Sequence, residues 1–81
     1  MPRFFFDTYD GEQILSDAEG VEFTGLESVR EAAVNALPGI ARDRFPNGET
    51  MEMWVKVRDA ANRPIFEASL IFSSRWIGEN G

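Results

Sequence analysis

The stretch Arg3-Phe4-Phe5-Phe6-Asp7 places three aromatic rings in a row near the beginning of this chain of 81 residues. Successive side chains of a β-strand point to opposite faces, so Phe4 and Phe6 share one face and Phe5 lies on the other. Both faces of such a strand require cover. A single layer of helix covers one face of a sheet and leaves the Phe5 face to a partner, a ligand or water.

The first strand ends in the turn sequence Tyr9-Asp10-Gly11-Glu12. Asp-Gly tolerates the positive φ values that a two-residue hairpin requires, so the chain is expected to fold back into a shorter strand over residues 13–17. This second strand has only Ile14 and Leu15 as large apolar residues and is expected at an edge of the sheet. Residues 21–23 briefly resume an extended pattern.

A helix is predicted over about residues 25–44. Its start is marked by Thr24-Gly25-Leu26-Glu27, a capping box in which the side chains of the first and last residues bond each other's backbone. An interior proline, Pro38, removes one hydrogen bond, so we expect either a kink or a break with a second helix beginning there. The apolar stripe continues beyond the proline, which favours the kink. The residues at helical spacing are Leu26, Val29, Ala33, Ala36, Leu37, Ile40 and Arg44, and Ala41 continues the apolar stripe.

The apolar pattern changes to a period of two from Thr50 onward, which indicates a half-solvated strand over residues 50–58. The loop at residues 59–64 closes a second hairpin, and a fourth strand follows over about residues 65–73. These strands, the first strand and the helix stripe define the predicted core. Its strand members are Phe4, Phe6, Met53, Val55, Val57, Phe66, Ala68, Leu70 and Phe72.

The element order β-β-α-β-β predicts an α+β fold in which one helix packs on one face of a four-stranded, mainly antiparallel sheet. The strand order 2-1-3-4 makes every neighbouring pair antiparallel and places strand four at an edge. The order 2-1-4-3 is the alternative. We expect a single domain over residues 1–77 and a disordered tail over residues 78–81, where apolar residues are absent.

The composition excludes several kinds of chemistry. The chain has no cysteine and no histidine, which removes disulfides, thiolate and imidazole catalysis, and the usual zinc sites. It contains no G-x-S-x-G, P-loop or G-x-G-x-x-G motif, and its serines have no histidine to act as a base. We therefore expect a protein that is not an enzyme and that carries no cofactor and no metal.

The charge is strongly acidic. Fourteen acidic and eight basic side chains give a net charge of −6, and Arg30 is the only basic residue between Asp7 and Glu31. This imbalance repels a phosphate backbone, so nucleic acid is not an expected partner. The chain has no signal-peptide pattern and no apolar run near the roughly 20 residues that span a bilayer. The expected location is the cytoplasm, with no membrane association.

Four stretches of the chain form a recognisable pattern. They are Pro2-Arg3-Phe4-Phe5-Phe6, Asp17-Ala18-Glu19-Gly20-Val21-Glu22, Leu26-Glu27-Ser28-Val29-Arg30-Glu31-Ala32-Ala33 and Val57-Arg58-Asp59. On these stretches, over about residues 2–72, the chain resembles a family of short, uncharacterised, mostly alphaproteobacterial proteins classed as a domain of unknown function. The resemblance implies no activity. Pro38-Gly39 is a departure, because similar proteins usually continue the helix at this point.

The stretch from Phe23 to Ala41 also resembles part of the HicB-type antitoxins, in which a short hairpin leads through a glycine and acidic residues into an Ala-rich amphipathic helix. The number of strands before the helix differs, and no DNA-binding tail follows. The resemblance implies an acidic domain that binds a protein.

Two groups of residues are candidate sites. Asp17, Glu19 and Glu22 form an acidic patch that could converge on a cation or face a basic partner, although their spacing is not that of an EF-hand loop. Apolar residues on the sheet face opposite the helix form a candidate interface, since aromatic anchors are common at interface centres. Its members are Phe5, Trp54, Ile65, Ile71 and Trp76.

The candidate interface favours a homodimer, because burying it against a second copy adds apolar area to a small core. Strand four offers a second route: Ala68 to Ser74 carry no charge, so two copies could pair edge to edge. The leading hypothesis is a non-enzymatic protein-interaction module, homodimeric through the sheet face or the strand-four edge. The alternatives are an acidic, antitoxin-like protein that binds a basic partner protein, and a domain that binds a small ligand or a cation.

Overall fold

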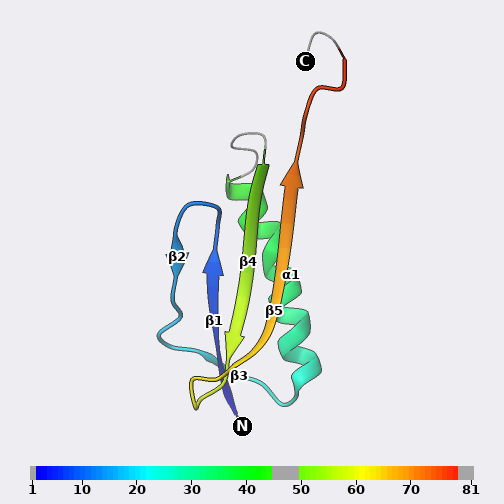
Figure 1. The fold of residues 1–81 in the computed structure, drawn as a ribbon. Coiled ribbons are helices and arrows are strands. Elements are labelled where there is room, and N and C mark those ends of the chain that lie inside the picture. The colour runs from blue at the N-terminus through cyan, green and yellow to red at the C-terminus, as the bar shows by residue number, and fades with distance from the viewer. Residues whose placement is uncertain (1, 45–49, 79–81) are drawn as a thin grey trace.

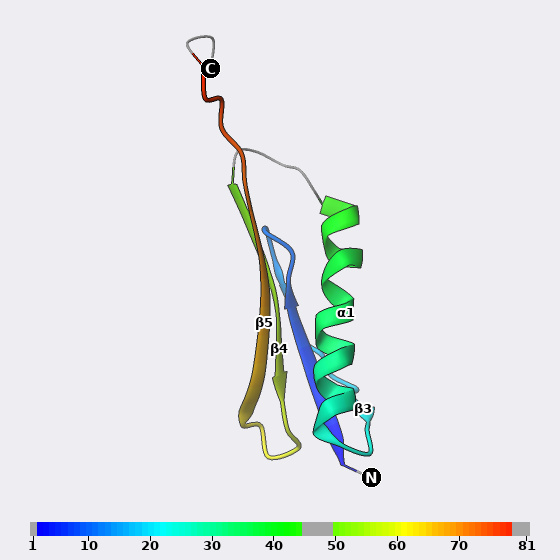
Figure 2. The ribbon, with the colours of Figure 1, turned by 90° about the vertical axis from the view of Figure 1, so that its right-hand side faces the viewer.

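The computed structural model describes residues 2–44 and 50–78, so residues 79–81 of the predicted tail lie outside the description. A sheet and a helix form two layers, with the helix running along one face of the sheet (Figure 1 and Figure 2). The predicted α+β fold is confirmed. Its elements are β1 (Arg3–Tyr9), β2 (Ile14–Leu15), β3 (Val21–Glu22), α1 (Leu26–Arg44), β4 (Thr50–Arg58) and β5 (Pro64–Ser73).

The strand pairs of the sheet are antiparallel, and the order is β2-β1-β4-β5, with β3 paired to the beginning of β1. Since β4 and β5 are the third and fourth predicted strands, the order 2-1-3-4 is confirmed and 2-1-4-3 is wrong. The short strand β3 is additional to the four predicted strands, and β2 is shorter than the predicted strand over residues 13–17. The long strand β5 lies at the outer edge of the sheet.

The core lies between α1 and the facing side of β1 and β4. The predicted alternation is visible in β4, where every second side chain from Met51 to Val57 is buried. Phe6, Phe23, Phe66 and other partly buried apolar residues pack around this centre. The buried members are Phe4, Val29, Ala33, Leu37, Met51, Met53, Val55 and Val57.

Three predicted core residues are exposed instead. The exposed fraction is 68% for Leu26 and 39% for Leu70, and Ala36 is also exposed. The diagonal course of α1 explains the first two. In Figure 1 the beginning of α1 projects beyond the outer edge of β5, whereas its end lies behind β4. Leu26 therefore overhangs the sheet edge, and Leu70 lies where the helix has moved away from β5.

Helix α1 is continuous through Pro38, so the predicted alternative of a break with a second helix is wrong. The predicted capping box is also wrong: among the hydrogen bonds of the described residues, Thr24 and Glu27 do not bond each other. The Glu27 carboxylate lies 3.4 Å from Arg30 instead. No helix in the described part of the chain has the length and hydropathy needed to cross a membrane.

A β-bulge near the start of β5 changes the direction of one side chain. The register pairs Val57 with Phe66 and Arg58 with Pro64, so Ile65 is the extra residue of the bulge. Ile65 therefore lines a hollow beside the beginning of α1. Strict alternation predicts Ile65 on the opposite face, and the bulge corrects that prediction.

Two glycines test the packing of the fold. Gly20 has a φ of +72°, and an added Cβ would lie 2.9 Å from the carbonyl oxygen of Phe4 and from the ring of Phe5. We expect Gly20→Ala to lower the free energy of unfolding by about 1–3 kcal/mol. Gly39→Ala within α1 meets nothing within 4 Å and should raise it by up to about 1 kcal/mol. Urea unfolding followed by circular dichroism measures both changes, and effects of the same sign would contradict this packing.

Candidate interaction surface

Phe5 is half-buried on the sheet face opposite α1, beneath side chains of its own chain. The guanidinium of Arg58, on the neighbouring strand β4, lies 4.8 Å from the centroid of the Phe5 ring. The electron-rich face of an aromatic ring attracts such a cation. Gly20 approaches the same ring so closely that an added Cβ would lie 2.9 Å from it. Phe5 is therefore covered without any partner.

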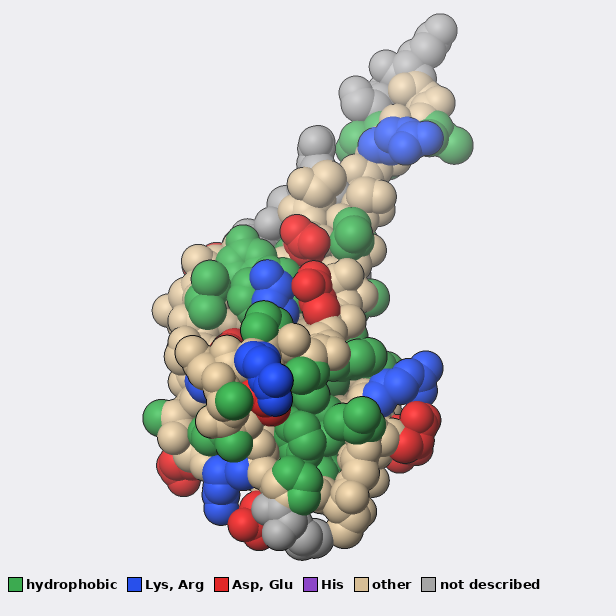
Figure 3. All heavy atoms as spheres, turned by 60° about the horizontal axis from the view of Figure 1, so that its bottom comes forward, with side chains coloured by type: hydrophobic (Ala, Val, Ile, Leu, Met, Phe, Trp, Pro, Cys, Tyr) green, Lys and Arg blue, Asp and Glu red, His purple; other side chains and the backbone are tan. Residues whose placement is uncertain are grey.

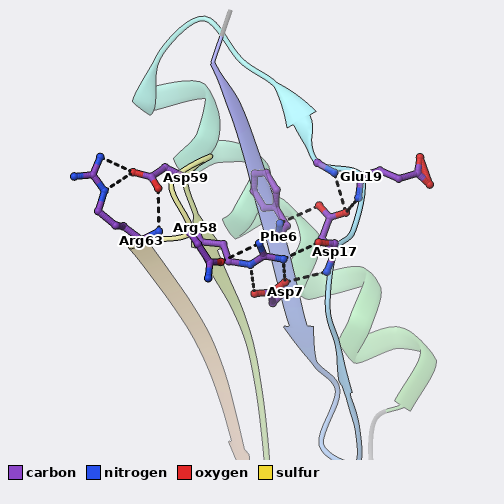
Figure 4. A network of polar contacts seen from close by, with 9 residues as sticks. Phe6, Asp7, Asp17, Glu19, Arg58, Asp59 and Arg63 are labelled. Carbon is purple, nitrogen blue, oxygen red and sulfur yellow. Dashed lines mark hydrogen bonds and ion pairs between the residues drawn. The ribbon is translucent and has the colours of Figure 1, made fainter.

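Arg58 is held in place by hydrogen bonds to β1 and to two loops (Figure 4). Its Nε and Nη2 donate to the two carboxylate oxygens of Asp7 at 2.9 and 3.2 Å. Nη2 also donates to the backbone carbonyl of Asp17 at 2.7 Å, and Nη1 donates to Oδ1 of Asn62 at 3.2 Å. A guanidinium and a carboxylate in this two-bond geometry form one of the stronger polar contacts in proteins. We call Asp7, Asp17 and Arg58 the Arg58 cluster.

Asp17 organises the loop between β2 and β3. Its carboxylate accepts hydrogen bonds from the backbone N–H groups of Phe6, Glu19 and Gly20 at 3.0, 3.1 and 3.0 Å. Its own backbone N–H donates to Oδ1 of Asp7 at 2.9 Å. The loop is thereby tied to β1, and Gly20 is brought against Phe5.

The Arg58 cluster lowers the pKa values of both of its carboxyl groups. The hydrogen bond from Arg58 is the main reason that the pKa of Asp7 lies below its ordinary value. Burial by itself would raise the pKa of Asp17, but the hydrogen bonds from the backbone of Phe6, Gly20 and Glu19 outweigh it, and the net pKa is lowered. Both groups are therefore ionised at neutral pH, as their structural contacts require.

The three members of the predicted acidic patch do not converge. Asp17 is turned toward β1, and Glu22 lies 3.6 Å from Arg3 in a surface ion pair. The side chain of Glu19 points away from the cluster (Figure 4). Within residues 2–44 and 50–78, no group of three or more acidic side chains is placed to hold a metal ion.

Trp54 is half-buried in the middle of the open face, by which we mean the sheet face opposite α1. Its ring centroid lies 5.5 Å from that of Tyr9, the residue directly opposite on β1. The Nζ of Lys56 lies 4.3 Å from the Trp54 centroid. Such cross-strand contacts stabilise a sheet locally. Phe5 and Trp54, two members of the predicted interface, are thus both partly covered by β1 and β4 side chains.

Five of the ten exposed large apolar side chains among the described residues lie along β5 and the segment that follows it, and the other five are Ile14, Leu15, Val21, Leu26 and Val34. The exposed fraction is 70% for Ile71, 80% for Trp76 and 91% for Ile77. Figure 1 shows this segment projecting beyond the rest of the fold in the direction of the strand. Sequence reasoning includes three residues of this group and misses Leu70 and Ile77. The group, called the β5 edge surface below, consists of Ile65, Leu70, Ile71, Trp76 and Ile77.

Two apolar hollows are lined in part by residues of the β5 edge surface. The first hollow, of about 340 Å³, lies between the beginnings of α1 and β5, and its apolar lining is Phe4, Leu26, Val29, Ile65 and Phe66. Figure 3 shows hydrophobic side chains gathered at this end of the molecule, with acidic and basic side chains around them. The second hollow, of about 290 Å³, lies toward the end of β5, and its lining is Ala41, Met53, Leu70, Ile71 and Phe72.

Sequence reasoning does not predict the Arg58 cluster, although one signal for it is present. Asp7 interrupts an otherwise aromatic row on the open face, and Arg58 lies on the neighbouring strand with the opposite charge. Opposite charges on the same face of adjacent strands attract each other. The contribution of Asp17 has no such signal, because a loop residue cannot be placed by strand periodicity.

One protein-family model matches residues 3–71, and it describes a domain of unknown function, DUF6894. The chain belongs to this family. The resemblance to a domain of unknown function is thereby confirmed. No curated protein and no solved structure matches the chain, and no similarity to HicB-type antitoxins is found. The DUF6894 match contains the whole Arg58 cluster, whereas Trp76 and Ile77 follow it in the sequence.

We expect the DUF6894 domain to lose stability on acidification. The pKa values of Asp7 and Asp17 in the folded state lie below the ordinary value of 3.8, so the unfolded chain binds protons more readily in acid. The stability that these groups contribute is complete above about pH 5 and is lost as the pH falls through and below that ordinary value. Urea midpoints at neutral pH and at about pH 3 measure the loss.

Two variants separate the Arg58 cluster from other acidic groups. Asp7→Asn should be less stable than the wild type at neutral pH and should lose less stability on acidification, because an amide neither pairs with Arg58 as an ion nor titrates. Glu19→Gln, at an exposed neighbouring position, should follow the wild type at both pH values. A loss in Asp7→Asn as large as that of the wild type would contradict this role of Asp7.

Proposed function

We propose that the protein is a non-enzymatic protein-interaction module that pairs with a second copy through the outer edge of β5. The supporting observation is the character of that edge: β5 has ten residues, and the chain carries no charge from Ala68 within β5 to Ser74 directly after it. Natural sheets protect their edges with short strands, charges, prolines or bulges. The β2 edge follows this rule with its two residues. On β5 the bulge and the proline lie at the beginning, and the rest of the strand has neither.

Pairing along β5 would cover Ile71, which is 70% exposed in the single chain, together with the other exposed apolar side chains of β5.

The contacts on the open face favour the β5 edge over that face as the pairing surface. Phe5 lies beneath Arg58, and Trp54 lies against Tyr9 and Lys56. A partner on the open face would have to displace these side chains. Pairing along β5 displaces none of the contacts just named, and strand addition supplies backbone hydrogen bonds as well as apolar contacts.

The acidic alternative has less support from the described contacts. Asp7 and Asp17 are engaged by Arg58 and by backbone N–H groups, and Glu22 is paired with Arg3. The carboxylates of Asp7 and Asp17 are therefore not free to meet a basic partner, and that of Glu22 lies in a surface ion pair. Glu19 is exposed, but its side chain points away from Asp17, so the predicted acidic patch does not form one surface.

The proposal predicts a dimer that depends on one edge. Light scattering after gel filtration should give twice the monomer mass of 9.1 kDa. Ile71→Lys should weaken the dimer by at least about 100-fold, because each copy loses the burial of one isoleucine, worth roughly 1.5–3 kcal/mol. Ile14→Lys, on β2 with an exposed fraction of 59%, is the matched control and should leave the dimer intact. A wild-type protein of 9.1 kDa at high micromolar concentration would contradict the proposal.

A further inference from the structure

We infer that the two β5 strands pair in one particular register, with Ile71 opposite the second copy's Ile71, and that Trp76 of each copy enters the first hollow of the other. This inference rests on the proposed pairing through β5 and specifies its geometry. In an antiparallel pair related by a two-fold axis, residues at equal distances on either side of the axis lie opposite one another. Ile71 is the middle residue of the uncharged stretch from Ala68 to Ser74.

Charge complementarity selects this register. Glu67 and Arg75 lie at equal distances before and after Ile71, so each glutamate would lie opposite an arginine of the other copy. Among the described residues, neither Glu67 nor Arg75 takes part in an ion pair. Opposite charges at directly facing positions stabilise an antiparallel pair. The axis produces two such pairs, one at each end of the uncharged stretch.

Neighbouring registers lack this complementarity. In an antiparallel pair, directly opposite residues lie on the same face of the sheet. The two-fold axis therefore passes through a residue, and each alternative register places the axis at a different residue. With the axis at Leu70, Glu67 would face Ser73, and Arg75 would face Ile65. An axis one residue beyond Ile71 would place Arg75 opposite Ser69 and Glu67 opposite Ile77. Both shifts separate the charges and place one of them against an isoleucine.

The same register brings Trp76 to the first hollow when the paired strand extends beyond Ser73, where β5 ends in the single chain. Trp76 lies as far after Ile71 as Phe66 lies before it, so in the extended pair the indole of one copy would face Phe66 of the other, and strand alternation would place it on the helix side. Phe66 lines the first hollow, whose volume is about 340 Å³. Trp76 is 80% exposed in the single chain and lies on the projecting segment seen in Figure 1. The hollow and the indole would then cover each other.

The course of α1 leaves room for this arrangement. The axis at Ile71 lies toward the end of β5, so the second copy is displaced along the strand and only its C-terminal segment reaches the beginning of β5. In Figure 1 the beginning of α1 overhangs this part of the edge, and the end of α1 lies behind β4. The overhang therefore covers the second copy's Trp76. Near the axis, the second hollow of one copy would face the second hollow of the other copy, and Leu70 lines each of them.

Single cysteines test the register, because the chain has no cysteine of its own. Directly opposite residues have Cα atoms about 4.5–5.5 Å apart, within the range that a disulfide spans. Ile71→Cys should therefore form a disulfide-linked dimer under mild oxidation. Ser69→Cys and Ser73→Cys should each fail to do so alone, but an equimolar mixture of the two should cross-link. Ile71→Ser, with no thiol, is the control for the substitution itself.

Fluorescence tests the docking of Trp76. In a Trp54→Phe background the emission comes from Trp76, and it should shift to longer wavelength when the dimer is diluted to monomer. The disulfide-linked Ile71→Cys dimer in that background should keep the shorter wavelength on dilution. Leu26→Lys places a charge in the first hollow and should abolish the shorter wavelength. Val34→Lys, at an exposed α1 position not assigned to either hollow, is the matched control and should not change the emission.

The outcomes separate this inference from the proposed function. A dimer in light scattering that cross-links through residues other than the predicted ones would overturn the register and leave pairing through β5 in place. A cross-linked Ile71→Cys dimer whose Trp76 emits as in water would overturn the docking alone. A monomer at every concentration, with no cross-link from any of the cysteines, would overturn both.

Discussion

In the described part of the chain, one helix covers one face of the sheet, and the opposite face carries the aromatic residues Phe5 and Trp54 among charged side chains. Helix α1 covers the face with Phe4 and the buried row of β4, and no helix within residues 2–44 and 50–78 covers the open face. The chain covers the open face with polar side chains instead: Arg58 lies over Phe5, and Lys56 lies over Trp54. This division between a helix-covered face and a face covered by polar side chains determines where apolar side chains stay exposed. The edge of β5, which lies beyond both kinds of cover, keeps its apolar side chains exposed.

The acidic first third of the chain has a structural use that net charge alone does not reveal. Asp7 forms an ion pair with Arg58, whereas the Asp17 carboxylate organises the loop that packs against Phe5 and its backbone carbonyl accepts a hydrogen bond from Arg58. On the open face, the aromatic strand β1 is therefore covered by a short loop and by one arginine. Two of the stretches that carry the family resemblance, one around Asp17 and one around Arg58, are far apart in the sequence. The hydrogen bond between Arg58 and Asp17 brings them together in the fold.

Periodicity predicts much of the fold. The alternation after Thr50 predicts the buried row of β4, and antiparallel pairing of neighbours favours the strand order that the structure has. Periodicity cannot predict the bulge that turns Ile65 to the helix side, because a bulge depends on how two strands meet. The continuity of α1 through Pro38 depends in the same way on tertiary packing, which offsets a local cost.

The candidate surface is less predictable than the fold for a related reason. Strand alternation alone assigns Phe5 and Trp54 to an open apolar face, but their exposure depends on Arg58 and Lys56, whose positions follow from register. Leu70 is predicted in the core, and its exposure depends on the diagonal course of α1. The exposure of these side chains therefore depends on how the helix and the strands pack against each other. The uncharged stretch from Ala68 to Ser74 is evident from the sequence, because the positions of charged residues along the chain do not depend on packing.

Amide hydrogen exchange along β5 tests the central claim that this edge pairs with a second copy. Alternate residues of an edge strand direct their N–H groups away from the neighbouring strand, and pairing protects those groups from exchange. The account predicts that every amide between Glu67 and Ser73 is protected at high protein concentration, and that alternate ones lose protection on dilution. Alternate amides that exchange rapidly at every concentration would contradict it, because β5 would then be an open edge in solution.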